Sequence, residues 1–189
     1  MKDLISVDDY KIYAGVSSTD NDEKFELVAK NISSLVKTYC ARNFIDNYDI
    51  STSSFTDITE YFNGGSDVYY TSEFPLVSIT SVSYSDDGGQ TYTALTDYTD
   101  YILDKQNDRI MLSGAENIVF PNYFKIVYKG GYSETPYDLR LACLDLMDYY
   151  IKRESTKAKS SASVSLEYIT TSDFPSHIKR VLDLYRIIR

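Results

Sequence analysis

The chain has 189 residues, of which 43% are hydrophobic, and its formal net charge is −9. This length favours one folded domain that can carry an insertion, and the acidic balance opposes non-specific binding of nucleic acid by the protein as a whole. No stretch has the apolar length of a signal peptide or a membrane span, so we expect a soluble protein that is made in the cytoplasm and does not enter a membrane.

The charge is distributed unevenly along the chain. Residues 1–149 carry 24 Asp and Glu against 11 Lys and Arg, whereas residues 150–189 carry 4 against 8. An acidic region is therefore joined to a basic C-terminal segment. This pattern fits either ordinary solubility or two surfaces that meet different partners, and the sequence leaves both interpretations open.

A short helix is predicted near the N-terminus. Ser6 and Asp9 have the spacing of a capping box, in which each side chain bonds the backbone of the other residue. Gly15 is a typical helix stop because glycine adopts left-handed backbone angles without strain. We therefore expect a helix over residues 7–14.

A longer helix should follow. Thr19 or Asp20 is expected to cap its first turn, and the helix should end at about Arg42. Its apolar residues recur at the spacing of a single buried stripe. They are Phe25, Val28, Ala29, Ile32, Leu35, Val36, Tyr39 and Cys40.

The composition changes after residue 43 to one rich in Thr, Ser, Tyr and Val, with recurring turn residues. Glycine pairs at positions 64–65 and 88–89 are strong turn signals between short extended runs. This pattern predicts a small antiparallel sheet inserted between helices. The expected strands cover residues 58–62, 68–70, 77–84, 92–95, 101–103, 109–112 and 123–128.

The helix that should begin at Pro136 and end at about Arg153 carries two apolar lines. The first comprises Leu139, Ala142, Cys143, Leu146, Met147 and Tyr150. The second comprises Leu141, Leu144 and Ile151. A surface helix of a monomer needs one apolar face, so this helix is expected to be central or to be covered partly by a neighbouring subunit.

The C-terminal segment is expected to be an arm followed by a helix. Residues 154–165 are polar, small and basic, which is typical of a linker or mobile arm, and a short extended piece is expected over residues 164–169. A last helix should begin at Ser172 or Asp173, with Pro175 in its first turn, and run to the C-terminus. Its apolar stripe of Ile178, Val181, Leu182, Tyr185 and Ile188 can dock on the chain's own core or on another chain.

The sequence shows no convincing catalytic, metal or cofactor site. His177 is the single histidine, with no acidic or cysteine cluster near it in the sequence, and is expected to be a solvated surface residue. Cys40 and Cys143 fall on apolar stripes and are expected to be small core residues. The aspartate runs lack the ligand spacing of a calcium loop, and the glycine pairs do not match a phosphate-binding loop.

The order of these parts resembles the head-tail connector (head-completion adaptor) family of tailed bacteriophages. The resemblance covers almost the whole chain, and its short motifs are specific only in combination. They are SVDDYKIYAGV at 6–16, YCARNF at 39–44, TEYFNG at 59–64, FPLVSITSV at 74–82, DYILD at 100–104, YKGGY at 128–132, PYDL at 136–139 and LDLYR at 182–186. The inserted sheet looks larger than in the shortest members.

The resemblance implies a non-enzymatic virion protein of the phage neck. Such a protein forms a ring, commonly of twelve subunits, beneath the portal, extends the DNA channel without sequence-specific DNA binding, and is the platform for the next neck or tail-completion protein. It uses no cofactor or metal. Carried onto this chain, the candidate portal-binding residues are Lys157, Lys159, Ile178, Lys179, Arg180, Leu182, Tyr185 and Arg186, and the candidate inter-subunit residues are Leu141, Leu144 and Ile151.

The expected fold is therefore α+β: a helical core of about four helices, an inserted antiparallel β-sheet domain, and a C-terminal arm plus helix. The expected divisions are a ring-forming core of residues 1–43 and 130–153, a β region of residues 44–129, and a docking segment of residues 154–189. The alternatives are another neck ring protein, such as a tail-completion protein, and a Tyr-rich carbohydrate-binding module, which the 19 tyrosines favour and the absence of Trp opposes.

Overall fold

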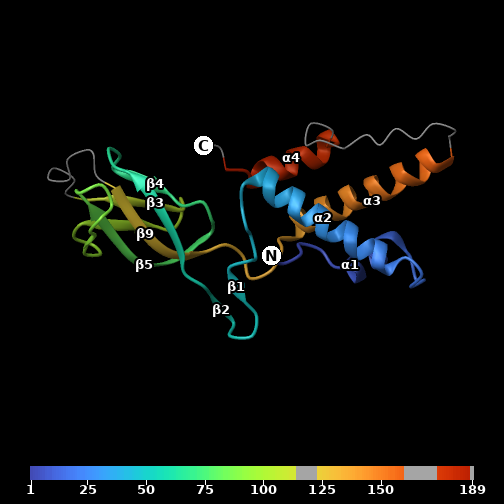
Figure 1. Cartoon of the computed structure of the whole chain (residues 1–189), viewed down its shortest axis with the longest axis horizontal. Helices are drawn as coiled ribbons and strands as arrows, with labels where there is room; N and C mark the ends of the chain where they lie inside the picture. The colour runs from blue at the N-terminus through green and yellow to red at the C-terminus, as the bar shows by residue number, and fades with distance from the viewer. Residues whose placement is uncertain (114–122, 160–173, 188–189) are drawn as a thin grey trace. The chain divides into compact units, whose positions relative to one another are not determined.

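The computed structural model describes residues 1–113, 123–159 and 174–187. It divides into two compact units, a helical unit of Met1–Arg42 and Glu134–Arg189 and a β unit of Asn43–Ser133. Figure 1 labels the helices and most of the strands. The described residues form four helices and several small antiparallel sheets, which confirms the α+β class expected from the sequence.

The first helix confirms the prediction from its local sequence. α1 spans Val7–Ala14, with both capping-box bonds between Ser6 and Asp9 present and Gly15 in the left-handed conformation.

α2 spans Asp22–Cys40, and its Asn21 cap makes no side-chain bond. The expected cap at Thr19 or Asp20 is therefore wrong, and the Asp20 carboxylate instead accepts the hydroxyl of Ser18 at 2.7 Å.

The third helix is longer than predicted. α3 spans Tyr137–Lys159 and so continues six residues past Arg153. The added segment contains no Gly or Pro, and its Glu, Lys and Ala residues favour helix. The arm expected from residue 154 is thus helical up to Lys159, while the extended piece expected over 164–169 lies outside the described residues.

The last helix is shorter than predicted. α4 spans Ser176–Tyr185, with Pro175 before its first residue. Arg186 leaves the helix with extended backbone angles, so the helix ends before the C-terminus.

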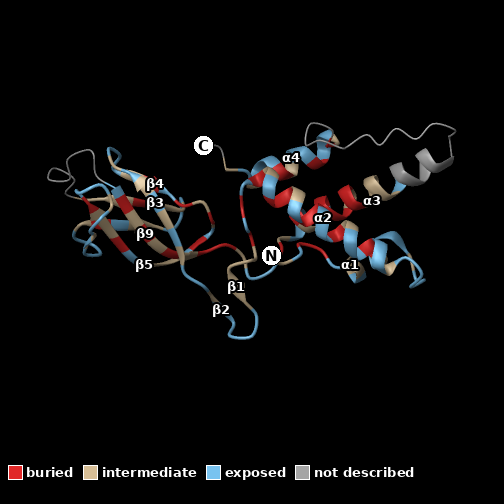
Figure 2. Ribbon diagram, viewed as in Figure 1, coloured by how far each residue is buried: buried red, intermediate tan, exposed pale blue. Residues whose placement is uncertain are grey.

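The helical unit buries one apolar core among its four helices (Figure 2). α2 and α3 each contact the other three helices, so the two together form the centre of the unit. Cys40 and Cys143 are free thiols in this core, as predicted, and burial raises the pKa of each to about 12. The core residues are Leu4, Ile5, Tyr10, Phe25, Ala29, Ile32, Val36, Cys40, Leu139, Ala142, Cys143, Leu144, Leu146, Met147, Phe174, Ile178 and Leu182.

The β unit contains two antiparallel sheets and a hairpin. The four-stranded sheet has the order β3-β9-β5-β6, formed by Ile58–Asn63, Tyr123–Gly130, Leu76–Ser85 and Thr93–Ala94. The three-stranded sheet has the order β4-β8-β7, formed by Val68–Tyr70, Arg109–Leu112 and Tyr101–Asp104. The two-residue strands β1 (Tyr48–Asp49) and β2 (Ser54–Phe55) were not predicted from the sequence.

The two larger sheets bury a common core. Tyr69, Tyr101 and Ile110 come from the three-stranded sheet and pack with Phe124 and Ile126 of β9. Along β9 buried residues alternate with more exposed ones, so one face of the four-stranded sheet is buried and the other faces outward. The single sheet expected from the sequence is thus two sheets that share one core.

Buried backbone contacts join the two ends of the β unit. The Glu73 carboxylate is buried and accepts the backbone N–H groups of Asn43 at 2.5 Å and Phe44 at 3.2 Å. The N–H of Tyr132 donates to the Phe44 carbonyl at 3.0 Å. The entry and exit of the unit are therefore bonded to each other.

The glycine pair at the end of β9 is required by this packing. A Cβ at Gly130 would lie 2.3 Å from the Glu73 carbonyl oxygen, and a Cβ at Gly131 would lie 2.4 Å from the Phe44 carbonyl oxygen. Gly131 also has a φ of +101°, which other residues adopt only with strain. The pair is therefore a place of close backbone approach.

Candidate assembly surfaces

The C-terminal helix packs on the core of its own helical unit. Ile178 and Leu182 have exposed fractions of 1% and 0%, and Phe174, just before the helix, is also buried. The Leu182 carbonyl oxygen lies 3.5 Å from the Cys40 sulfur on α2. This burial removes Ile178 and Leu182 from the candidate partner-binding set, because a side chain in the interior contacts no partner.

Two further predicted residues of this segment make contacts within the chain. The Tyr185 hydroxyl donates to the Asp138 carboxylate on α3 at 2.6 Å. The Arg186 guanidinium lies over the ring of Tyr39 on α2, 5.1 Å from its centroid. These contacts position α4 on its own unit and leave the outer side of the helix exposed.

Tyr39 of α2 also contacts α4, through its hydroxyl. It donates to the Asp183 carboxylate at 2.5 Å. Burial and this hydrogen bond raise the pKa of Tyr39 above its usual range.

The outer side of α4 presents two cations and one apolar side chain. Lys179 and Arg180 are exposed, and within the described part of the chain neither forms an ion pair. Leu184, one turn after Arg180, is 74% exposed. Leu184 was not among the residues predicted from the sequence. An apolar residue outside the buried stripe of its helix is a signal that could have identified it.

The other two predicted cations, Lys157 and Lys159, lie at the end of α3. Their side chains lie outside the described residues.

The second apolar line of α3 is divided between the interior and the surface. Leu144 is 8% exposed and belongs to the core, which removes it from the inter-subunit set. Leu141 is 51% exposed and Ile151 is partly buried. Leu144 therefore lies on a packed side of α3, and Leu141 lies on an exposed side.

Tyr137 extends the exposed part of this face. It is 77% exposed and lies four residues before Leu141, so the two side chains occupy the same side of the helix. The guanidinium of Arg140 lies 5.6 Å from the centroid of the Tyr137 ring. The surface of Tyr137 and Leu141 is called here the α3 face. Only Leu141 of this face was identified from the sequence, because Tyr137 was assigned to neither apolar line of the predicted helix.

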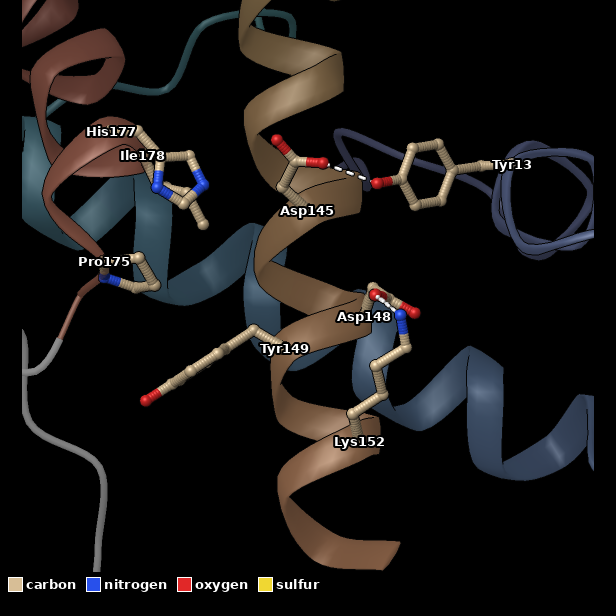
Figure 3. A pocket seen from close by; sticks show the side chains of 8 residues that line it. All are labelled: Tyr13, Asp145, Asp148, Tyr149, Lys152, Pro175, His177 and Ile178. Atoms are coloured by element: carbon tan, nitrogen blue, oxygen red, sulfur yellow. Dashed lines mark hydrogen bonds and ion pairs between the residues drawn. The ribbon is translucent and has the colours of Figure 1, made fainter. Parts of the chain in front are cut away.

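A groove of about 380 Å³ lies beside α3 (Figure 3). Its carboxylates are occupied by neighbours: Asp145 accepts the Tyr13 hydroxyl at 2.6 Å, and Asp148 pairs with Lys152 at 2.6 Å. The bond to Asp145 raises the pKa of Tyr13 to about 12. The lining residues are Tyr13, Asp145, Asp148, Tyr149, Lys152, Pro175, His177 and Ile178.

The groove lining includes the single histidine of the chain. His177 at its rim is exposed, as predicted. Among the described residues, no group of three or more His, Cys, Asp and Glu side chains is placed to hold a metal ion. The helices described here also include none with the length and apolar character needed to span a membrane.

Comparison with known proteins gives agreement over nearly the full chain. A family model described as "Head completion protein" matches residues 3–188. The head completion protein of Escherichia phage T5 is 20% identical over 188 residues, covering 97% of this chain and 98% of that protein.

Two solved structures share the fold. A chain from the neck of an empty GTA particle, computed with C6 symmetry, matches with a TM-score of 0.57 and 14% identity, over 98% of this chain and 91% of that chain. A chain from the neck of a native GTA particle, computed with C12 symmetry, gives a TM-score of 0.53 and 13% identity, over 100% and 95% of the two chains.

Proposed function

The chain belongs to the head completion protein family, and on that premise we propose that twelve copies form a ring at the neck of a tailed-phage virion, beneath the portal. The role is structural: the ring completes the DNA-filled head, extends the DNA channel and is the platform for the next neck protein. The observation that carries this proposal is the family match over residues 3–188. The C6 and C12 symmetries of the two similar neck structures support a ring.

The α3 face is the proposed contact between neighbouring subunits. Leu141 and Tyr137 place apolar surface in solvent on α3. Contact with a second copy would remove this surface from water, which stabilises association by about 25 cal/mol for each Å² buried. Ile151, partly buried on the same helix, is proposed to lie at the border of this contact.

The outer side of α4 is the proposed contact with the portal. Lys179, Arg180 and Leu184 combine two unpaired cations with an exposed apolar side chain, a combination that suits an acidic and partly apolar partner surface. Tyr185 and Arg186 are proposed to support the contact by fixing α4 on α2 and α3.

The β unit is proposed to face the channel or its exit. It carries 13 Asp and Glu against 4 Lys and Arg, so its net charge of −9 equals that of the whole chain, and the helical unit is neutral. Like charge suppresses phosphate contacts, which lets DNA pass without adhering. We propose that the protein is made in the host cytoplasm and incorporated into the virion, without catalysis and without sequence-specific DNA binding.

The ring is tested by mixing the purified protein with purified portal and imaging the complexes by negative-stain electron microscopy. The wild-type protein should add a ring of density to one end of the portal. Portals that stay bare at saturating protein would reject the proposed function. A monomer in the absence of portal does not contradict it, because the proposed ring forms on the portal.

Leu141→Asp should reduce ring occupancy at least about tenfold, because each subunit contact would lose apolar burial and gain a desolvated charge. The folded monomer should keep its stability to within about 0.5 kcal/mol, as is usual for an exposed position. Occupancy is measured from the electron micrographs and monomer stability by urea denaturation. Leu27→Asp is the matched control because Leu27 is exposed on α2. An equal loss in both variants would show that the α3 face is not the specific contact.

The double variant Lys179→Glu, Arg180→Glu should weaken binding to the portal by at least about tenfold at 0.15 M salt, since each lost charge pair at an interface costs on the order of 1 kcal/mol. Surface plasmon resonance on immobilised portal measures the affinity. Lys24→Glu, Lys30→Glu on α2 applies the same charge change elsewhere on the helical unit. The portal assignment fails if the two double variants bind alike.

A further inference from the structure

The outward face of the four-stranded sheet differs in charge from the rest of the β unit. The register places Lys125 of β9 opposite Tyr61 of β3 and Ser83 of β5, and Tyr123 opposite Asn63 and Ser85. Lys125 and Lys129 alternate with the buried residues of β9, so both lie on this outward face. We call Tyr61, Tyr92, Tyr123, Lys125 and Lys129 the tyrosine-lysine face.

Lys125 lies over the ring of Tyr92. Its Nζ lies 5.7 Å from the centroid of the Tyr92 ring, and the rings of Tyr92 and Tyr61 are 6.3 Å apart. Tyr61 and Tyr123 are both exposed at this face. A cation placed over an aromatic ring keeps its charge while part of its water is replaced.

Both lysines lack a carboxylate partner among the described residues, in a unit with 13 acidic side chains. Asp57, the residue just before β3, does not pair with either lysine, and its carboxylate accepts the hydroxyl of Thr80 at 2.8 Å. By contrast, Arg109 of the other sheet pairs with Asp104 at 2.8 Å. The unit therefore presents two of its four cations, unpaired, on one face together with exposed tyrosines.

The loop between β6 and β7 has the complementary character. Tyr98 is 83% exposed and follows the exposed Asp97. The loop is ordered by hydrogen bonds from Tyr98 N–H to the Tyr101 carbonyl at 2.9 Å and from Thr96 N–H to the Asp100 carboxylate at 2.7 Å. Tyr98 also has a φ of +60°, which is uncommon for a residue with a side chain. A projecting aromatic residue beside a carboxylate suits a surface of tyrosines and lysines.

We propose that the Asp97–Tyr98 loop of one copy docks on the tyrosine-lysine face of the next copy in the ring. This inference rests on the proposed ring, and it assigns a second contact, between β units, beyond the α3 face. A cyclic ring joins two different surfaces of identical subunits. Neighbouring β units that each carry −9 repel one another. A local contact of opposite charge between the β units of two copies would offset this repulsion.

DNA is a weaker candidate for the same face. A duplex carries one phosphate charge per about 1.7 Å of its length, and two lysines on a unit of net charge −9 provide little compensation. The rings of Tyr61 and Tyr92 are inclined by 55°, so they do not form a flat platform for stacked bases. A single carboxylate next to a tyrosine matches the face better.

A charge exchange tests the contact in the portal-dependent ring assay. Lys125→Glu and Asp97→Lys should each lower ring occupancy at least about tenfold, and the double variant Lys125→Glu, Asp97→Lys should restore it to within about threefold of wild type. Lys105→Glu, in the exposed β7–β8 turn, is the control for the same charge change in the same unit and should assemble normally. Hydrogen exchange of each monomer verifies that the β unit remains folded.

The outcomes separate this contact from the ring itself. If wild type forms no ring on the portal, the proposed function fails. If Lys125→Glu assembles as wild type does, or if the double variant shows no recovery, the ring stands and the loop contact is rejected. A gel-shift titration with duplex DNA completes the test: DNA binding by wild type that Lys125→Glu abolishes would reassign the face to nucleic acid.

Discussion

Gly131→Ala is expected to unfold the β unit at temperatures where the helical unit remains folded. The added Cβ would lie 2.4 Å from the Phe44 carbonyl oxygen, and the backbone has a φ of +101°. The same Phe44 carbonyl accepts the Tyr132 N–H, so a shift that relieves the clash would strain this hydrogen bond. Overpacking and strain of this kind together cost roughly 2–5 kcal/mol, a large part of the stability of a domain.

Hydrogen exchange followed by mass spectrometry measures this effect because it separates peptides of residues 43–133 from those of the helices. Gly88→Ala is the matched control: Gly88 has a φ of +77° in the same unit, but nothing lies within 4 Å of its added Cβ. It should cost only the backbone strain, about 1 kcal/mol. Equal protection in the two alanine variants would show that the close approach at Gly131 contributes nothing.

Leu182→Ala is expected to destabilise the helical unit by about 2–5 kcal/mol, the usual cost of a cavity at a fully buried leucine. Leu182 is 0% exposed on the inner side of α4. Thermal unfolding followed by circular dichroism at 222 nm measures the loss, since the helices dominate that signal. The melting temperature of the helical unit should fall by several degrees.

Leu184→Ala is the control on the same helix, two residues away and 74% exposed, and it should change stability by less than about 0.5 kcal/mol. Similar losses at both positions would contradict the packing of α4 on its own unit. A truncation that removes α4 cannot serve as a test of portal binding, because it also removes Ile178 and Leu182 from the core.

Local chemistry explains what could be predicted from the sequence. The capping box of α1 depends on residues three positions apart. β4 and β8 have the predicted bounds because polar turn residues border these short apolar runs. The two-residue strands β1 and β2 are too short to have a periodicity. The division of seven predicted strands into two sheets depends on pairings such as Ile58 with Tyr128, which no local pattern specifies.

The candidate surfaces were less predictable because an apolar stripe does not specify its partner. Ile178 and Leu182 have the spacing of a docking surface, and the structure shows that they dock within their own unit. Leu144 and Leu141 are the same residue type three positions apart, yet one is 8% exposed and the other 51%, a difference that depends on tertiary packing and not on local sequence. Exposed residues such as Leu184 and Tyr137 become visible as candidates once the packed positions are known.

The hydrogen bond between Phe44 and Tyr132 has a consequence for evolution. The β unit begins and ends at adjacent points, so its removal would leave two chain ends that a short loop can join. Such an insert can grow, shrink or be exchanged as a cassette while the helical unit keeps its sequence and fold. Relatives with the same helices are therefore expected to differ most in the size and surface of this insert.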